Sequence, residues 1–341
     1  MITSDHTLLS DVKGARIDFS SDPVQLGPLS PNVPGSNSDI VDCEIAKLLD
    51  KCVIETATHS VDEIISGIFL TPKKDGTFRL ILNLKQLNHF IPYHHFKMDT
   101  LKSILKLVER NCFLASLDLK DAYYSVPVHW SDRKYLRFIW RNQLYQFTCW
   151  PNGLAYCPRR FTKLLKPPLT TLHKKGHVIA GYIDDLCLEA KTFEEAVLNV
   201  IDSTIQFLEL GFVIHPEKSV FLPSQRLELL GFCIDSVSMR ITLLPEKAVA
   251  LRSLCENLLG APRFSIRELA RVIGKMVSSF PGVEYGPLYY RSLEADKTRA
   301  LRLHKGDFDQ HLTALSPEAD RELNRWIRNV IVSKNLLSLL T

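Results

Sequence analysis

The segment VIAGYIDDLCLEA (residues 178–190) places two adjacent aspartates between two apolar runs. Neighbouring side chains of a strand point to opposite faces of the sheet, so Asp184 and Asp185 could not both face one site from within a strand. The pattern therefore predicts a hairpin with these two aspartates as its two-residue tip. Such tips favour Asn-Gly or Asp-Gly, and a departure from that preference is typical of a functional site. We expect a cation to compensate the concentrated charge.

A third carboxylate lies in FLASLDLKDAYY (residues 113–124). Apolar and polar side chains alternate up to Asp118, which predicts a strand with this aspartate directed away from the core. Three converging carboxylates would suit two Mg²⁺ ions, because hard cations prefer oxygen ligands. Two such ions about 3.5–4 Å apart activate an attacking oxygen and stabilise a leaving one in phosphoryl transfer. The alternative, ordinary turn and surface acids, fits either segment alone but is less favoured for the two together.

The composition predicts a folded protein of one large or two ordinary domains, with 45% hydrophobic and 23% charged residues among 341. No apolar run in the sequence is long enough to cross a membrane, and the start MITSDHTLL lacks the features of a signal peptide. Eight cysteines without a CxxC pair, most of them in apolar runs, indicate reduced thiols. We therefore expect an intracellular protein, in the cytoplasm or nucleus, with no membrane partner.

The basic residues are clustered, although the net charge of +4 is too small to indicate a polyanionic partner by itself. Aromatic and apolar residues are interleaved with the clusters, which are PKKDGTFR (72–79), DRKYLRFIWR (132–141), PRRFTKLLK (158–166) and HKKGH (173–177). This pattern suits a groove for nucleic acid. Solvated helix faces would give a similar pattern, so the clusters alone leave both interpretations open.

The predicted elements are mixed α and β. Residues 1–40, rich in Ser, Pro, Asn and Asp without a sustained period, predict an extended lead segment. A stripe from Val41 to Cys52 predicts an amphipathic helix, and two β-prone runs around KKDG predict a basic hairpin. Further predictions are a helix at 100–109, a strand at 112–119, a hairpin at 135–149 turning at Arg141-Asn142, a helix at 155–172 interrupted by Pro167-Pro168, and a helix at 193–211.

After Pro245 the chain changes to helical periodicity. Ser265 and Glu268 have the spacing of a capping box, and Ser316-Pro317 has the form of a helix start. The acidic residues of this tail lie in polar or helical contexts, with no apolar strand beside them to direct a carboxylate inward. The tail is therefore predicted to be a separate helical subdomain.

Several segments in order resemble the motifs of reverse transcriptases. GYIDDLC (181–187) resembles the YxDD box, and SLDLKDAYYSVPV (116–128) resembles motif A. The other similar segments are LTPKKDGTFRLILNLKQLN (70–88) for the fingers motif, WPNGLAYCPRRFTKLL (150–165) for the template and nucleotide grip, GFVIHPEKS (211–219) for motif D and LELLGFCID (227–235) for the primer grip. The amino-acid sequences of residues 95–105, 117–138 and 161–167 are most similar to those of the DIRS group of tyrosine-recombinase retrotransposons, with gypsy-type elements next.

The resemblance implies an α+β right-hand polymerase. Residues 1–40 would be a lead segment, 41–245 the fingers and palm, and 246–341 a helical thumb and connection without a complete RNase H domain. The implied function is an RNA-directed DNA polymerase of a retroelement, which extends a primer 3′-OH with dNTPs on an RNA or DNA template. RNase H and tyrosine recombinase regions of the same element would be further partners. The alternatives are an inactive or domesticated nucleic-acid-binding remnant and, less favoured, a structural or interaction module.

The resemblance also implies roles for individual residues. Asp118, Asp184 and Asp185 would hold two Mg²⁺ ions, for which Mn²⁺ could substitute. Asp185 would contribute less directly to metal binding than the other two. Lys218 would protonate the leaving pyrophosphate. The incoming nucleotide would meet Arg79, either Lys73 or Lys74, Asn152, and Tyr123 as the group that blocks a ribose 2′-OH. Primer and template would meet Tyr182, Gly153, Leu230, Gly231 and Phe232.

Asn152 departs from the family pattern. Many members read Pro-Gln-Gly or Pro-Phe-Gly where this chain reads Pro151-Asn152-Gly153, and Trp150 replaces the usual leucine before it. Asparagine keeps the amide donor but is one methylene shorter than glutamine. The departure therefore changes the reach of the sugar contact that the resemblance implies, and it bears on fidelity.

Overall fold

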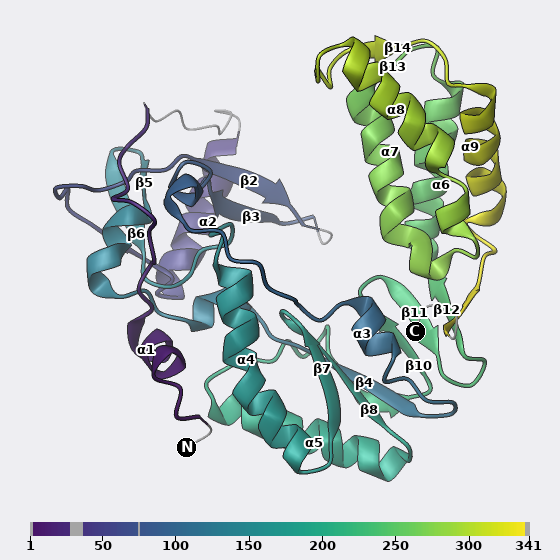
Figure 1. Ribbon diagram of the computed structural model, residues 1–341. Helices are drawn as coiled ribbons and strands as arrows, with labels where there is room; N and C mark the ends of the chain where they lie inside the picture. The colour runs from purple at the N-terminus through teal and green to yellow at the C-terminus, as the bar shows by residue number, and fades with distance from the viewer. Residues whose placement is uncertain (1–2, 28–36, 74–75, 338–341) are drawn as a thin grey trace. The chain divides into compact units, whose positions relative to one another are not determined.

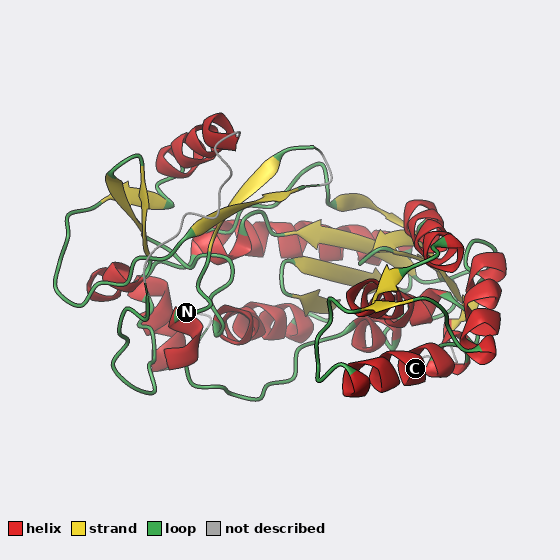
Figure 2. Ribbon diagram, turned by 90° about the horizontal axis from the view of Figure 1, so that it is seen from above, coloured by secondary structure: helices red, strands yellow, loops and turns green. Residues whose placement is uncertain are grey.

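The computed structural model describes residues 3–27, 37–73 and 76–337 (Figure 1). The chain divides into two compact units, each built from several stretches of sequence. Unit 1 comprises Met1–Asp99, Leu117–Leu186 and Ile201–Ser219, and unit 2 comprises Thr100–Ser116, Cys187–Val200 and Val220–Thr341. Helices and antiparallel strands both contribute (Figure 2), so the predicted α+β class is confirmed. The predicted domain boundaries at residues 40 and 245 stay predictions.

The lead segment contains a helix, whereas an extended chain was predicted for residues 1–40. Helix α1 (His6–Gly14) starts at Asp5, whose carboxylate accepts two hydrogen bonds from backbone N–H groups of the first turn. The sequence showed no apolar period here because polar and small residues occupy much of the buried face. The buried residues of α1 are Leu8, Asp11 and Gly14.

An ion-pair cluster fastens the lead segment to helix α4 (Cys157–Lys174) within unit 1. The Arg160 guanidinium donates to both carboxylate oxygens of Asp11 at 3.1 and 3.0 Å, and to Asp18 at 2.6 Å. Arg160 and Asp11 are both buried. Since breaking a buried pair leaves an uncompensated charge, this cluster fixes α1 on the helix that follows the Pro-Asn-Gly loop.

Helix α4 runs without interruption through Pro167 and Pro168, although a break was predicted there. A proline inside a helix removes a backbone hydrogen bond and costs about 3 kcal/mol. The helix packs against strand β7 (Val178–Tyr182) and buries Leu165 and Leu172 on that side. Tertiary packing therefore outweighs the local preference of the two prolines.

The two predicted hairpins of unit 1 are confirmed. Strands β2 (Ile68–Pro72) and β3 (Phe78–Leu82) pair antiparallel, and Lys74 of their loop lies outside the described residues. Strands β5 (Arg137–Trp140) and β6 (Gln143–Phe147) turn at Arg141-Asn142, where both residues have positive φ. Two-residue turns with positive φ match the twist of the strands, which is why this hairpin was predictable.

Other elements of unit 1 surround these hairpins. Strand β1 (Ile54–Thr56) pairs with β6 to complete a three-stranded sheet of order β1-β6-β5. Helix α2 (Ser38–Asp50) precedes it and buries Val41, Ile45 and Leu48, which confirms the amphipathic helix predicted there. Short 3₁₀ turns lie at Leu87–Phe90 (η2), Ala122–Ser125 (η3) and Trp130–Tyr135 (η4).

Four strands form the sheet that carries the aspartates, in the order β7-β8-β4-β9. Beside β7 they are β8 (Asp185–Ala190), β4 (Phe113–Asp118) and β9 (Val220–Ser224). The predicted polar face of β4 is wrong for Ser116, which is buried like its neighbours. The four consecutive residues from Leu114 to Leu117 are all buried, so both faces of β4 are covered and the alternation is lost.

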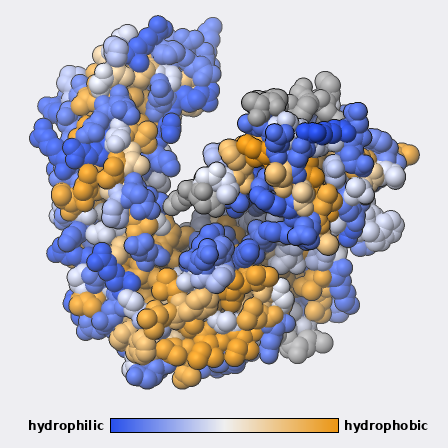
Figure 3. Space-filling model, turned by 180° about the vertical axis from the view of Figure 1, so that it is seen from behind, coloured by the Kyte–Doolittle hydropathy of each residue, from blue (hydrophilic) through white to orange (hydrophobic). Residues whose placement is uncertain are grey.

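Helix α5 (Phe193–Glu209) is apolar on its outer side as well as on its inner side. Phe207 is buried, whereas four apolar residues at spacings of three or four are exposed and line one side of the helix. They are Leu198, Ile201, Ile205 and Leu208. Figure 3 shows hydrophobic side chains gathered in the lower part of the viewed face, the level at which α5 runs in Figure 1. The helix thus presents an apolar stripe to solvent.

Unit 2 combines an antiparallel sheet with a helical bundle (Figure 1). The sheet, of order β10-β11-β12-β15, consists of β10 (Arg226–Leu229), β11 (Phe232–Asp235), β12 (Arg240–Leu243) and β15 (Asn335–Leu336). The bundle consists of α6 (Pro245–Gly260), α7 (Ile266–Ser279), α8 (Arg291–Leu303) and α9 (Pro317–Asn329), which pack on one another. The helices predicted after Pro245 are therefore present.

Short elements complete unit 2. Helix α3 (Leu101–Leu105) is shorter than the helix predicted for residues 100–109. The remaining elements are the paired strands β13 (Phe264–Ser265) and β14 (His311–Leu312) and the 3₁₀ turns η5 (Phe280–Gly282) and η6 (Gly286–Leu288).

The capping box predicted at the start of α7 is present, and Ser265→Ala should destabilise unit 2. Ser265 Oγ accepts from Glu268 N at 3.1 Å, and the Glu268 carboxylate accepts from Ser265 N at 2.7 Å. We expect the variant to lower the free energy of unfolding by about 0.5–2 kcal/mol, because a backbone donor loses its partner. Chemical denaturation measures the change, with Ser278→Ala on the exposed side of α7 as the control. Equal losses in both variants would contradict the prediction.

All eight cysteines carry free thiols, and six of them are buried. The predicted packing of reduced thiols among apolar side chains is confirmed for these six, whereas Cys43 and Cys52 are exposed. Across residues 3–27, 37–73 and 76–337, no helix is long and apolar enough to span a membrane.

Candidate active site

The hairpin that carries the adjacent aspartates turns one residue earlier than predicted. Strand β7 ends at Tyr182, Ile183 and Asp184 form the turn, and Asp185 begins β8. Ile183 has a φ of +57°, a left-handed conformation that is an outlier for a β-branched residue. Such strain persists only where the surrounding structure enforces it, and it is common at functional sites. Asp184 therefore stands at the turn, and Asp185 belongs to a strand.

Hydrogen bonds within unit 1 hold this turn against the end of β4 and the loop after α5. Leu119 N donates to the backbone oxygen of Asp184 at 2.8 Å. Asp118 N donates to Ser219 Oγ at 3.0 Å, and the Asp118 carbonyl accepts from His215 N at 2.8 Å. Three segments distant in sequence thus bring Asp118 close to the turn.

Asp118 and Asp184 line one cavity of about 320 Å³ in unit 1. The other residues with predicted roles that line it are Lys73, Arg79, Tyr123, Asn152 and Lys218. Asp185, Tyr182 and Gly153 are described but do not belong to this lining, and Lys74 lies outside the described residues. The structure therefore brings together two of the three aspartates with most of the groups expected to meet a nucleotide.

Burial raises the pKa of both aspartates of the hairpin. Burial, followed by the charges of Asp184 and Asp118, raises the pKa of Asp185 to about 6. Burial is also the first cause for the raised pKa of Asp184, with Asp118 adding to it and Lys218 opposing it. The Asp184 side chain is nevertheless exposed to solvent, so water screens part of this repulsion. The carboxylates therefore repel one another in the absence of a cation.

Basic side chains surround these carboxylates. Lys218 Nζ lies 3.8 Å from Asp118 Oδ2. Further cations in the lining are Lys51, Lys73, Arg79 and Lys120. Cationic groups bind phosphate oxygens through charge-assisted hydrogen bonds. A cavity that combines them with carboxylates suits a phosphate-bearing ligand that arrives with a divalent cation.

The donor chemistry of the cavity fits Mg²⁺, although the carboxylates are not arranged as a complete metal cluster. Among the residues that the structure describes, no three His, Cys, Asp or Glu side chains converge closely enough to hold a metal ion. Mg²⁺ is commonly held by one or two carboxylates together with waters and substrate phosphates. Asp118 and Asp184 could therefore hold it with ligands that water and substrate supply.

Asp185→Asn should stabilise the metal-free protein at neutral pH. The pKa of Asp185 is raised in the fold from 3.8 to about 6, so ionisation of this carboxyl destabilises the folded state. The penalty is absent below about pH 4, grows as the pH rises and is complete above about pH 6. At neutral pH the variant should therefore melt higher than the parent, by about 2–4 °C for each kcal/mol relieved.

Scanning calorimetry in a metal chelator measures this difference across the pH range. Asp202→Asn is a suitable control, because hydrogen bonding to His177 lowers the pKa of Asp202 and its charge is favourable in the fold. That variant should not gain stability at neutral pH. A gain for Asp185→Asn that persists at acidic pH, or an equal gain for Asp202→Asn, would contradict the prediction.

Tyr123 lies between the cavity and helix α4. Its ring packs edge-on against Phe161, with centroids 5.5 Å apart and ring planes at 90°. Phe161 is fully buried, so the tyrosine ring is supported from behind while it lines the cavity. A side chain held in this way can limit the space that a ligand has.

Several groups at this cavity were not predicted from the sequence. Lys51, which follows α2, forms an ion pair with Asp121 with 2.6 Å between Nζ and Oδ2. Both line the cavity, as do Lys120, Tyr124 and His215. Asp121 has a φ of +53°, and its place beside motif A could have drawn attention to it. No local pattern pairs it with Lys51, because the two are 70 residues apart.

The predicted primer grip is the turn between β10 and β11 in unit 2. Leu230 and Gly231 form this turn with φ values of +50° and +84°. Lys247 Nζ donates to the Leu230 carbonyl at 3.1 Å and lies 5.7 Å from the centroid of the Phe232 ring. A Cβ at Gly231 would collide with the Lys247 side chain. The turn is thus fixed by the first helix of the bundle.

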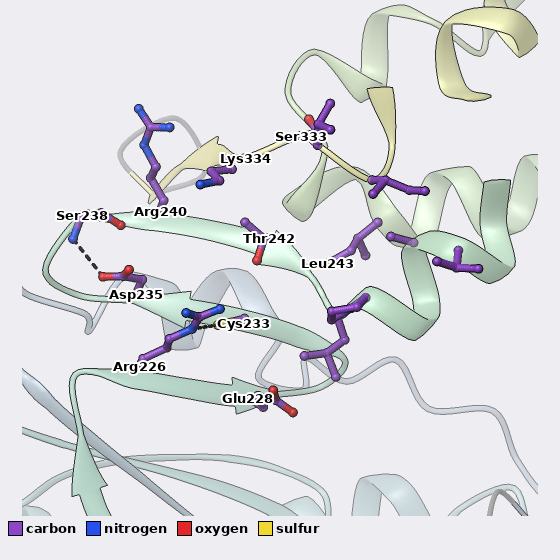
Figure 4. Close-up of a pocket in the computed structure, with 16 residues that line it drawn as sticks. Arg226, Glu228, Cys233, Asp235, Ser238, Arg240, Thr242, Leu243, Ser333 and Lys334 are labelled. Atoms are coloured by element: carbon purple, nitrogen blue, oxygen red, sulfur yellow. Dashed lines mark hydrogen bonds between the residues drawn. The ribbon is translucent and has the colours of Figure 1, made fainter. Parts of the chain in front are cut away.

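A cavity of about 780 Å³ lies on the same sheet (Figure 4). The figure shows its lining strands β10, β11 and β12, with Ser333 and Lys334 beside them. Two of its polar groups make contacts within the sheet, because Arg226 Nε donates to Cys233 Sγ at 2.9 Å and Asp235 caps the β11–β12 turn. This cavity is larger than the one in unit 1, but the gathering of carboxylates and cations marks the latter as the candidate active site.

Residues 71–234 match the family described as reverse transcriptase (RNA-dependent DNA polymerase). Similar curated proteins include the transposon Tf2-3 and Tf2-7 polyproteins of Schizosaccharomyces pombe, which are 26% and 25% identical over 168 residues. Each match covers 49% of this chain and 12% of the polyprotein. Residues 71–234 are therefore similar to reverse transcriptases, and the chain spans a small part of the length of these relatives.

The solved structures similar to this chain include foamy viral protease-reverse transcriptases. The one in complex with an RNA/DNA hybrid has a TM-score of 0.72 at 18% identity, covering 95% of this chain and 41% of that chain. The dRH form in complex with double-stranded DNA has a TM-score of 0.70 at 19% identity, covering 93% and 51%. The right-hand polymerase fold implied by the sequence is thereby confirmed.

Proposed function

We propose that the chain acts as the RNA-directed DNA polymerase of a retroelement and extends a primer 3′-OH with dNTPs. The observation that carries the proposal is the cavity in which Asp118 and Asp184 meet Lys73, Arg79 and Lys218. Phosphoryl transfer needs carboxylates that can hold Mg²⁺ beside cations that can hold phosphates. The proposed partners are a dNTP and a primer on an RNA or DNA template, consistent with the nucleic acids in the foamy viral complexes.

The residues of the cavity would divide the reaction among them. Lys73 and Arg79, which flank the β2–β3 loop, would bind the triphosphate through charge-assisted hydrogen bonds. Lys218, which pairs with Asp118, would donate a proton to the leaving pyrophosphate. Two Mg²⁺ ions, or Mn²⁺ in their place, would be held by Asp118, Asp184 and more remotely Asp185, and would activate the attacking oxygen and stabilise the leaving one.

Primer extension on poly-rA/oligo-dT with Mg²⁺ tests the proposal. The expected result is extension by the parent chain that is lost in Asp184→Asn. Salt-sensitive binding of the primer-template without extension would instead identify an inactive or domesticated nucleic-acid-binding protein. A chain that neither binds nor extends would be a structural or interaction module.

We also propose that the element belongs to the DIRS group, because the amino-acid sequences of residues 95–105, 117–138 and 161–167 resemble those of that group. The Tf2 polyproteins make a gypsy-type affiliation the competing proposal. The element would act in the cytoplasm or nucleus, together with RNase H and tyrosine recombinase regions. A tyrosine recombinase gene in the flanking DNA would support the DIRS affiliation, and a different integrating enzyme there would contradict it.

A further inference from the structure

The backbone of the loop that carries Asn152 is held on both sides within unit 1. Trp150, before the loop, is fully buried. After it, Asn88 Nδ2 donates to the Gly153 carbonyl and Asn88 Oδ1 accepts from Ala155 N, both at 2.9 Å. Gly153 has a φ of +99°, a conformation that favours glycine. The backbone around Asn152 is therefore fixed, and the orientation of its side chain depends on a further contact.

That contact is a hydrogen bond to a tyrosine hydroxyl. Asn152 Nδ2 donates to Tyr124 Oη at 3.2 Å, and both residues line the cavity that contains Asp118 and Asp184. An amide has donors on its nitrogen and acceptors on its oxygen. A tyrosine hydroxyl can accept from the amide nitrogen or donate to the amide oxygen, so it can hold one arm of the Asn152 amide and leave the other arm for a ligand.

Tyr124 is placed to act as a fixed partner. It lies in the η3 turn, where its backbone N–H donates to the Asp121 carbonyl at 2.7 Å. Burial raises the pKa of the Tyr124 hydroxyl to about 12, and Cys149 and Asp121 add to the effect. The hydroxyl is therefore neutral at physiological pH, so it can accept from the amide while it keeps its own proton for donation.

We propose that Tyr124 is a positioning residue of the nucleotide pocket, whose hydroxyl holds the Asn152 amide in place for contact with the incoming nucleotide. The inference rests on the proposed polymerase function and adds a residue to it. A glutamine, with one more methylene, reaches further from the same backbone position than asparagine does. In this chain the shorter amide of Asn152 is held by Tyr124, which lies in the segment that resembles motif A. The two residues therefore act as one unit.

A double-mutant cycle in the full chain tests this coupling. Tyr124→Phe keeps the ring and removes one oxygen, so it should raise the KM for the dNTP by roughly three- to tenfold, the effect of one hydrogen bond. The value of kcat should change by less than about twofold, because the contact is made before the chemical step. In an Asn152→Ala background, Tyr124→Phe should have no further effect, because its partner is already gone.

Tyr156→Phe is the matched control. Tyr156 is also buried beside this loop, and its hydroxyl has no hydrogen-bond partner among the described residues. Removing that hydroxyl should leave the KM for the dNTP unchanged. An equal rise in KM for Tyr156→Phe, or the same effect of Tyr124→Phe with Asn152 and with Ala at position 152, would overturn the proposal.

Nucleotide binding separates this proposal from the polymerase function on which it rests. With Ca²⁺ in place of Mg²⁺, the chain should bind primer-template and dNTP without extending the primer. The stability of this complex is measured as the dNTP concentration is raised, and the half-maximal concentration gives the affinity for the nucleotide. Tyr124→Phe should weaken that affinity by the same factor as in kinetics, with primer-template affinity unchanged. A parent chain that binds the dNTP but never extends a primer would overturn the proposed polymerase function. The double-mutant cycle could still be measured through the nucleotide affinities. A parent that does not bind the dNTP would overturn both.

Discussion

Asp184→Asn is expected to slow primer extension by at least about a hundred- to thousandfold, the loss typical of removing one electrostatic group from a transition state. Asparagine has nearly the same size, but it removes the negative charge that a metal ligand must supply. The Asp184 side chain is exposed at the turn, and it is the backbone oxygen that holds Leu119. The fold should therefore survive the change. Asp118→Asn and Asp185→Asn should also reduce extension severely.

Single-nucleotide extension under saturating dNTP measures the effect, while thermal unfolding and primer-template binding test that the chain remains folded. Glu217→Gln is the matched control, because Glu217 is an exposed acid beside Lys218 that does not line the cavity. That variant should extend primers at close to the parent rate. Near-normal extension by Asp184→Asn would remove the basis for assigning this cavity as the active site.

The parts of the fold that depend on near neighbours in sequence could be predicted. The cap of α7 joins residues only three apart, Ser265 and Glu268. The β5–β6 hairpin turns at Arg141-Asn142 because short polar residues such as Asn tolerate positive φ. The match of these local preferences with the final structure explains why strands β2 to β8 and helices α2, α4 and α5 were found within a few residues of their bounds.

Three of the failures share one cause, which is that tertiary packing overrode a local preference. Pro167 and Pro168 should end a helix, yet the buried side of α4 keeps it intact. Ser116 should lie on a polar face, yet both faces of β4 are covered there and the residue is buried. Ile183 is disfavoured in a left-handed turn, yet the turn falls there and moves Asp185 into a strand. None of these outcomes is encoded within a short window of sequence.

The same distinction applies to the candidate site. The aspartates and the cations of the β2–β3 hairpin were recognisable because charged residues stand out beside apolar strands. The contacts of Lys51 with Asp121 and of Asn152 with Tyr124 were not recognisable, because each joins separate segments of the chain. Side chains that orient other side chains are therefore visible only once the segments are assembled.

Tyr123→Ala is expected to admit ribonucleotides. The Tyr123 ring lines the cavity and is backed by the fully buried Phe161, so it cannot retreat from a larger sugar without displacing the core. Removing the ring opens space for a 2′-OH. We expect the preference for dNTP over rNTP, taken as the ratio of kcat/KM values, to fall by about ten- to two-hundredfold, the range for discrimination by pocket shape. Extension with dNTPs should fall much less.

Tyr123→Phe separates the volume of the ring from the chemistry of its hydroxyl. Because phenylalanine fills nearly the same space and keeps the edge-on contact with Phe161, it should retain most of the parent's preference for dNTPs. Competition between labelled UTP and dTTP on one primer-template gives the ratio for parent and both variants in the same assay. If Tyr123→Ala excludes ribonucleotides as well as the parent does, Tyr123 packs against Phe161 without governing the sugar. If Tyr123→Phe loses the preference as completely as Tyr123→Ala, a hydroxyl contact rather than the size of the ring selects the substrate.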